Sequence, residues 1–180
     1  MKSITAKSLL LGLLFLLCAA PLIWELAGWS MDERSVAAIA MDPYEVRSQL
    51  LTEAMERVGV CTAEDAARLW ADGVQGRSGA MQYAALSSRL KKEYAAALET
   101  FAPNWVTGGS SPWVQQVEIV KSGRQTTGQY TFQLRFDMMT STGPAGTLGA
   151  CLVVAEEDGF WRVTAMAYDD DLVPYTGYKP

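Results

Sequence analysis

A run of seventeen residues near the N-terminus, residues 8–24, contains no charged side chain and is rich in leucine. Lys2 and Lys7 precede this run and Glu25 follows it. Extended through Trp29, the run reaches about 22 residues, which is enough to span a bilayer, and positive charges before it favour a cytoplasmic N-terminus. The pattern predicts a short cytoplasmic end and a transmembrane anchor over residues 1–29, with the rest of the chain outside the cytoplasm.

A cleaved signal peptide is the alternative interpretation of this segment. The small residues 18–20 suit a cleavage site, but Pro21 would then follow the scissile bond, which makes a poor substrate. A lipid-modified Cys18 would need a small residue before it, and Leu17 stands there instead. Retention is favoured, and cleavage stays open.

The rest of the chain has the size and composition of one folded domain. About 150 residues remain, which is the usual length for one core. The hydrophobic fraction is 49% and the charged fraction 19%, so the chain is too apolar to be disordered. The net charge of -5, without a basic stripe, argues against nucleic acid as a partner.

Histidine is absent from the sequence, which excludes several kinds of site. A Ser-His or Cys-His nucleophile pair and a His-ligated zinc all need imidazole. The acidic run 169–171 lacks the spacing and the glycine of a calcium loop, so residues 169–180 are predicted to be a solvated acidic tail. We expect no cofactor and no metal. A disulfide between Cys61 and Cys151 is left open.

Helical periodicity runs from Asp42 to Glu99. Asp42 and Pro43 begin a helix that Gly59 ends, and Thr62 begins a second helix. A turn over residues 81–86 and a helix through residue 99, capped by Ser87 or Ser88, follow. Residues 30–61 are interpreted as a linker and an amphipathic helix. The apolar face of that helix comprises Val46, Leu50, Leu51, Ala54, Met55 and Val58.

Strand periodicity replaces helical periodicity after Pro103. Between residues 130 and 138, apolar side chains alternate with polar ones, so that Tyr130, Phe132, Leu134 and Phe136 share one face. Further strands are predicted over residues 113–121, 147–155 and 160–166. Helices followed by sequential strands predict an α+β fold, with the helices packed on one face of a curved antiparallel sheet.

Two helical stretches resemble the NTF2-like superfamily. Residues 62–70 resemble its first helix, and residues 81–91 its second helix and the following turn. Residues 105–108 together with residues 111–114, and residues 141–147, resemble a group of secreted or membrane-anchored NTF2-like domains of Firmicutes. The resemblance covers about residues 62–167, so residues 62–168 are assigned as the NTF2-like domain.

The resemblance implies a cone of helices and sheet whose open end is a pocket. Enzymes of the superfamily place an Asp-His pair or paired carboxylates in that pocket. Because this chain has no histidine, the resemblance implies a fold and a location but no reaction.

Two loops, residues 105–113 and 140–147, are rich in Gly, Ser, Thr and Pro, and the first of them begins and ends with a tryptophan. Such loops expose backbone N–H groups that can hold an anion or a peptide end, and tryptophans can stack on a sugar or a peptide. In the alternative interpretation the tryptophans fill the core and the glycines only permit turns. The candidate ligand-binding residues are Trp105, Thr107, Ser111, Trp113, Arg135 and Thr142.

Asp137 is the weak catalytic candidate. In an apolar cone it would act as a general base, whereas on a solvated face it would form an ion pair with Arg135. The sequence favours a membrane-tethered extracytoplasmic domain without catalytic activity that binds a peptide, a cell-wall fragment or a protein. An enzyme using Asp137 and a structural homodimerisation module remain the alternatives.

Overall fold

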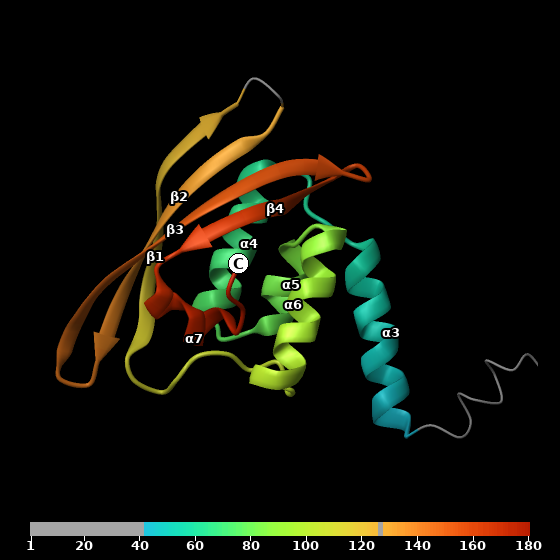
Figure 1. Ribbon diagram of the computed structural model, residues 1–180, viewed down its shortest axis with the longest axis horizontal. Helices are drawn as coiled ribbons and strands as arrows, with labels where there is room; N and C mark the ends of the chain where they lie inside the picture. The colour runs from blue at the N-terminus through green and yellow to red at the C-terminus, as the bar shows by residue number, and fades with distance from the viewer. Residues whose placement is uncertain (1–41, 126–127) are drawn as a thin grey trace, which may run out of the picture. The chain divides into compact units, whose positions relative to one another are not determined.

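The computed structural model describes residues 42–125 and 128–180, and the fold is α+β (Figure 1). These residues divide into two units between Gln49 and Leu50, inside the first described helix, and residues 50–180 form the folded domain. In chain order the elements are α3 (Pro43–Arg57), α4 (Ala63–Gln75), α5 (Gly79–Ala85), α6 (Ser88–Phe101), β1 (Trp113–Arg124), β2 (Tyr130–Thr140), β3 (Gly143–Glu157), β4 (Phe160–Tyr168), the 3-10 turn η1 (Asp170–Leu172) and α7 (Val173–Thr176).

Side-chain caps fix where three of the helices begin. The side-chain oxygens of Thr62, Ser78 and Ser87 accept hydrogen bonds from backbone N–H groups three residues on, at the starts of α4, α5 and α6. The caps at Thr62 and Ser87 confirm the predicted helix starts. The turn predicted over residues 81–86 is the helix α5. It begins earlier than expected, because Gly79 is its first residue.

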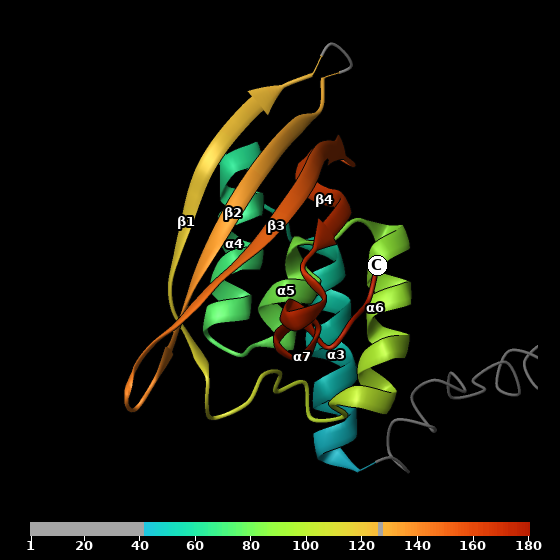
Figure 2. The same cartoon turned by 60° about the vertical axis from the view of Figure 1, so that its left-hand side comes forward.

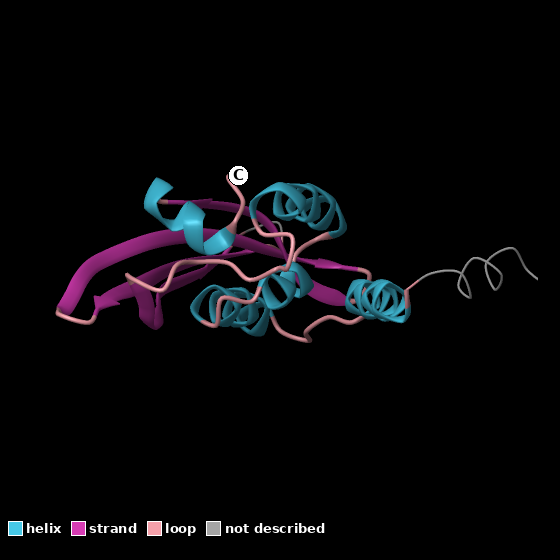
Figure 3. Cartoon of the chain, turned by 90° about the horizontal axis from the view of Figure 1, so that it is seen from below, coloured by secondary structure: helices cyan, strands magenta, loops and turns pink. Residues whose placement is uncertain are grey.

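The four strands form one antiparallel sheet in the order β1-β2-β3-β4, which confirms the predicted meander. Each strand is longer than its predicted range at one or both ends. The sheet is curved, and α4, α5 and α6 lie on one side of it (Figures 1 and 2). Figure 3 shows the curvature of the strands from a second direction.

The core lies between the sheet and α4. Phe132, Leu134 and Phe136 are buried on one face of β2, as predicted, while Tyr130 at the strand end is half-buried. Trp70 of α4 is fully buried and meets the Phe136 ring edge-on, with ring centroids 6.2 Å apart. Because α4 contacts all four strands, it is the central helix of the domain.

The helical half also covers the outer edge of β4. Val60 pairs with Trp161, and Leu86 pairs with Val163. The N–H of Ser87 donates to the Val163 carbonyl at 2.9 Å. These short bridges place the end of α3 and the end of α5 beside the same strand.

Residues 169–180, predicted to be an acidic tail, carry η1 and α7 and return to the domain. Leu172 and Tyr175 are buried, and the Tyr175 hydroxyl donates to the Pro112 carbonyl at 2.8 Å. Asp169–Asp171 are exposed, but the Asp169 carboxylate accepts the N–H of Gly149 at 2.6 Å. The prediction of a solvated tail rests on these exposed charges. The buried Leu172 and Tyr175 that follow them attach the segment to the domain.

The predicted membrane anchor, residues 1–29, and the linker through residue 41 lie outside the described residues. No helix within residues 42–125 and 128–180 is long and apolar enough to cross a membrane.

Candidate functional site

The first half of the predicted binding loop is part of the interior. The Trp105 ring packs on Tyr83 with centroids 5.1 Å apart, and Thr107 is fully buried and accepts a hydrogen bond from Gln82 Nε2 at 3.1 Å. The Arg77 guanidinium donates to the carbonyls of Thr107 and Gly108, both at 3.0 Å. For Trp105 and Thr107, the interpretation of the loop as packing therefore fits the geometry.

The second half of the loop lies next to the β2–β3 turn. Trp113 is half-buried, pairs with Met139 and donates through Nε1 to Gln115 Oε1 at 2.9 Å. Ser111 is exposed, and Thr142 is exposed in the turn. The structure thus brings Trp113 near the turn but does not unite the six predicted ligand-binding residues on one surface.

Arg135 and Asp137 lie on the exposed face of β2, opposite to the buried face of Phe136. Arg135 forms ion pairs with Glu118 of β1 at 2.5 Å and with Asp137 at 3.2 Å, and their side chains are all partly exposed. The pair of Asp137 with Arg135 is the ion pair that the sequence allowed as an alternative, and the pair of Arg135 with Glu118 connects β2 to β1. Asp137 does not point into the apolar interior where a general base would need to lie.

An open cavity of about 420 Å³ lies between the end of α3 and the helices α4 and α5. We call it the aliphatic groove, because its lining side chains are all aliphatic or methionine. Its rim is exposed, with Leu51 at 59% and Val58 at 63% of their full accessibility. The lining residues are Leu51, Ala54, Met55, Val58, Gly59, Val60, Leu69, Ala80 and Ala84.

Two buried cations hold the α3 wall of the aliphatic groove in place. Lys91 of α6 donates from Nζ to the Met55 carbonyl at 2.8 Å, and Arg162 of β4 donates to the Val58 carbonyl at 3.1 Å. Both side chains belong to residues only 4% exposed. Cations suit this position because the last carbonyls of a helix lack intrahelical partners and carry partial negative charge.

The same arginine reaches the opposite wall. Arg162 also donates to the Ala84 carbonyl at 3.3 Å, at the end of α5. The helices α4 and α5 pack closely there, since a Cβ on Gly73 would lie 2.7 Å from the Gln82 backbone nitrogen. The groove is therefore built from walls that hydrogen bonds and tight packing fix relative to each other.

Glu157, the last residue of β3, is a nearby carboxylate with a shifted pKa. Partial burial acts to raise its pKa, but hydrogen bonds from Ser88 and the charges of Arg162 and Lys91 outweigh burial and lower it. The Ser88 N–H donates to Glu157 Oε1 at 3.0 Å, in the first turn of α6. An anion at a helix N-terminus is the favourable arrangement.

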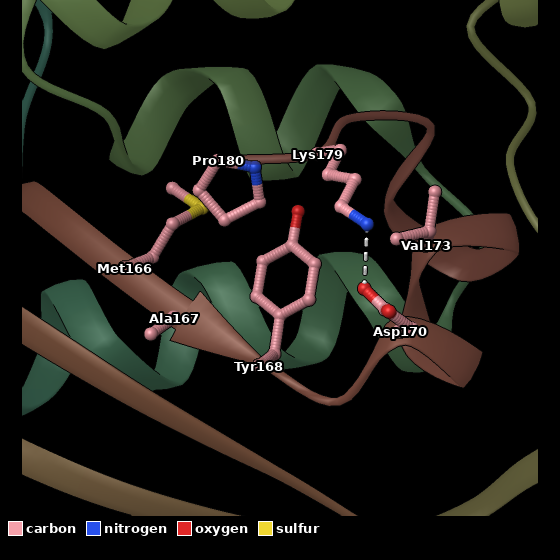
Figure 4. A pocket seen from close by; sticks show the side chains of 7 residues that line it. All are labelled: Met166, Ala167, Tyr168, Asp170, Val173, Lys179 and Pro180. Carbon is pink, nitrogen blue, oxygen red and sulfur yellow. Dashed lines mark ion pairs between the residues drawn. The ribbon is translucent and has the colours of Figure 1, made fainter.

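A second cavity, of about 230 Å³, lies beside the end of β4 (Figure 4). Figure 4 shows the Tyr168 ring between Met166 on one side and the ion pair of Lys179 with Asp170, 2.8 Å long, on the other. The Tyr168 hydroxyl donates to the Tyr178 carbonyl, and burial raises the pKa of Tyr168. The polar side chains of this cavity all have hydrogen-bond or ion-pair partners, and the exposed Lys179–Asp170 pair adds little to stability.

Metal-ligating side chains do not gather in the part of the chain that the structure describes, where no group of three or more carboxylates and cysteines meets. Cys61 and Cys151 are both free, so the disulfide that the sequence left open is not formed.

No protein-family model matches this chain, and no curated protein matches it either. The fold and the groove define its class directly: an α+β domain with a four-stranded antiparallel sheet and an open aliphatic groove on its helical side.

The sequence contains one sign of the groove, in the apolar face predicted for residues 43–58. A face of this kind ordinarily packs on the core, yet Leu50, Leu51 and Val58 are exposed. The adjacent Leu50 and Leu51 make this apolar surface wider than one packed face needs. The small residues Ala80 and Ala84 on α5 leave the space opposite, and nothing in their spacing indicates that.

Proposed function

We propose that this chain is a membrane-tethered, extracytoplasmic NTF2-like domain that binds an apolar ligand in the aliphatic groove. The groove itself is the observation that carries the proposal. Helices that precede an antiparallel meander, with α4 packed across all four strands, support the NTF2-like assignment. The charge asymmetry around residues 8–24 supports the tether.

The size and lining of the groove support binding. Ligand sites have volumes of roughly 300 to 1,000 Å³ and mostly apolar walls, and the aliphatic groove has both properties. Covering an exposed Leu or Val side chain is worth roughly 1.5 to 3 kcal/mol when burial is complete. Leu51 and Val58 are both more than half exposed, so an occupant gains much of this free energy.

Filling the groove tests the proposal. The full chain is reconstituted in vesicles, and bis-anilinonaphthalene sulfonate is added as the apolar probe, with protein-free vesicles as background. Ala84 lines the groove and Ala96 is exposed on α6, so Ala84→Trp and Ala96→Trp form a matched pair. We expect wild type and Ala96→Trp to bind the probe equally, and Ala84→Trp to lose most of the binding. Equal probe fluorescence in all three proteins contradicts the proposal.

Protease accessibility tests the tether separately. A tag at the C-terminus of the full chain is expected to stay with the membrane fraction and to be digested when protease is added outside the cytoplasmic membrane. Two results contradict the tether: a shortened form of the chain that is released from the membrane, or a tag that protease reaches only after the membrane is dissolved.

A further inference from the structure

We infer that the occupant of the aliphatic groove is an acyl chain of a membrane lipid. This inference rests on the proposed function, because it requires that the domain be tethered at a membrane and that the groove bind. It adds the chemical class of the ligand, which the groove's size, its engaged carbonyls and the length of the linker indicate together.

The size of the groove suits a single unbranched chain. Its volume of about 420 Å³ lies toward the lower end of the roughly 300 to 1,000 Å³ that small-molecule sites have. Every side chain of its lining is apolar, so a chain of methylene groups can occupy it without hydrogen bonds.

The backbone groups of the groove disfavour an extended peptide. An extended peptide brings N–H and C=O groups that need hydrogen-bond partners when they are buried. The carbonyls of Met55, Val58 and Ala84 already accept hydrogen bonds from Lys91 and Arg162. The lining side chains include no hydrogen-bonding group. An acyl chain needs none, so it satisfies the groove where a peptide does not.

The length of the linker places the membrane within reach. Residues 30–42 separate the end of the predicted anchor from α3, and a fully extended chain of that length spans at most about 45 Å. The domain therefore stays beside the bilayer, where acyl chains are the most abundant apolar groups. The exposed rim residues Leu51 and Val58 are suited to contact with lipid.

Photo-crosslinking tests the inference. The full chain is reconstituted in phosphatidylglycerol and phosphatidylcholine vesicles that contain a lipid with a diazirine on its acyl chain. After illumination, mass spectrometry maps the adducts. We expect adducts in residues 50–60 and 80–84 of the wild type and of Ala96→Trp, and at least a fivefold decrease of these adducts in Ala84→Trp. Adducts in residues 8–24 serve as the internal reference and are expected to stay constant.

Several outcomes overturn the inference. Adducts confined to residues 8–24, or adducts at the groove that Ala84→Trp and Ala80→Trp leave unchanged, show that no acyl chain occupies it. When a photo-crosslinking amino acid replaces Leu51, covalent dimers of the chain without lipid adducts at the groove show a protein occupant instead. If the fluorescent probe binds in a groove-dependent way but lipid does not label it, this inference fails and the proposed function stands. A melting measurement on both variants confirms that they are folded.

Discussion

The Arg162 guanidinium donates to the carbonyls of Val58 and Ala84, which lie on opposite walls of the aliphatic groove. Val58 follows α3 and Ala84 belongs to α5, so one side chain from β4 joins two helices that are not adjacent in the sequence. Because Arg162 is only 4% exposed, water replaces its hydrogen bonds poorly. The shape of the groove therefore depends on this arginine.

Substituting Arg162 by Met is expected to lower the free energy of unfolding by about 2 to 4 kcal/mol. The change removes two part-buried hydrogen bonds from a charged donor, each worth roughly 1.5 to 3 kcal/mol, and the methionine recovers part of the packing. Urea unfolding measures the difference. Arg135→Met is the matched control, because Arg135 makes only partly exposed ion pairs, and it is expected to cost less than about 1 kcal/mol. Equal losses in the two variants contradict the structural role of Arg162.

Phe132→Ala is expected to cost about 3 to 5 kcal/mol, because it removes a buried aromatic side chain from the face of β2 that meets the helices. Gln133, its neighbour on the other face, is exposed, so Gln133→Ala is expected to change stability by less than about 0.5 kcal/mol. Thermal unfolding distinguishes the two. If Gln133→Ala proved the more harmful, the strand register would be wrong.

Leu51→Ser tests whether the rim of the groove is free in the folded domain. Leu51 is 59% exposed, so we expect the substitution to change the free energy of unfolding by less than about 0.5 kcal/mol. Leu86 is a fully buried leucine, so Leu86→Ala is expected to lower the free energy of unfolding by about 2 to 5 kcal/mol. A cost of several kcal/mol for Leu51→Ser, measured by denaturant unfolding in detergent-free buffer, would mean that Leu51 already has a partner.

The strand region could be predicted from the sequence because its pattern is local. Alternation through Phe132, Leu134 and Phe136 fixes which face of β2 is buried, and this face is correct. Whether the apolar face of α3 is covered was harder to predict. Periodicity shows that Leu51 and Val58 lie on one face of the helix, but it does not show whether another element packs on that face. Covering depends on distant residues, here Ala80 and Ala84, whose small size leaves the groove open.

The candidate site could be predicted only in part, for the same reason. The composition of the loop around Trp105 and Thr107 suits a binding surface as well as it suits a packed loop. The hydrogen bond from Gln82 to Thr107 and the packing of Trp105 on Tyr83 decide between the two, and both partners lie more than twenty residues earlier in the chain. Arg162 was equally unpredictable, since the sequence does not indicate which carbonyls a strand arginine will meet.

Glu157 is expected to make stability depend on acidic pH. Its pKa is lowered in the folded protein, so its contribution is present above the unfolded value of about 4.3 and is lost as the pH falls through the lower folded value. At neutral pH, Glu157→Gln is expected to lose about 1 kcal/mol, because it weakens the hydrogen bond from the Ser88 N–H. Unfolding between pH 7 and pH 3 should show a smaller acid-induced loss in the variant than in wild type. Glu156→Gln, at the exposed neighbouring position, is the control and should retain the wild-type dependence.

Tyr94 and Tyr168 are expected to make the domain unfold in alkali. Burial is the main cause that raises the pKa of each hydroxyl, and the neighbouring Tyr168 adds to the shift of Tyr94. For a raised pKa, the stabilisation is complete below the unfolded value of about 10 and is lost as the pH rises above it. In absorbance titrations at alkaline pH, these two tyrosines should therefore ionise only when the domain unfolds, whereas in concentrated urea all tyrosines should ionise together.

Removing the two hydroxyls should have opposite effects on stability. The Tyr94 hydroxyl is buried and has no hydrogen-bond partner among the described residues, so Tyr94→Phe is expected to leave stability at pH 7 unchanged or to raise it by up to about 1 kcal/mol. The Tyr168 hydroxyl donates to the Tyr178 carbonyl, so Tyr168→Phe is expected to lose about 1 kcal/mol. Both variants should reduce the amplitude of the late ionisation step by the contribution of one tyrosine. A wild-type protein whose tyrosines all titrate near pH 10 while it stays folded would contradict the burial of these two side chains.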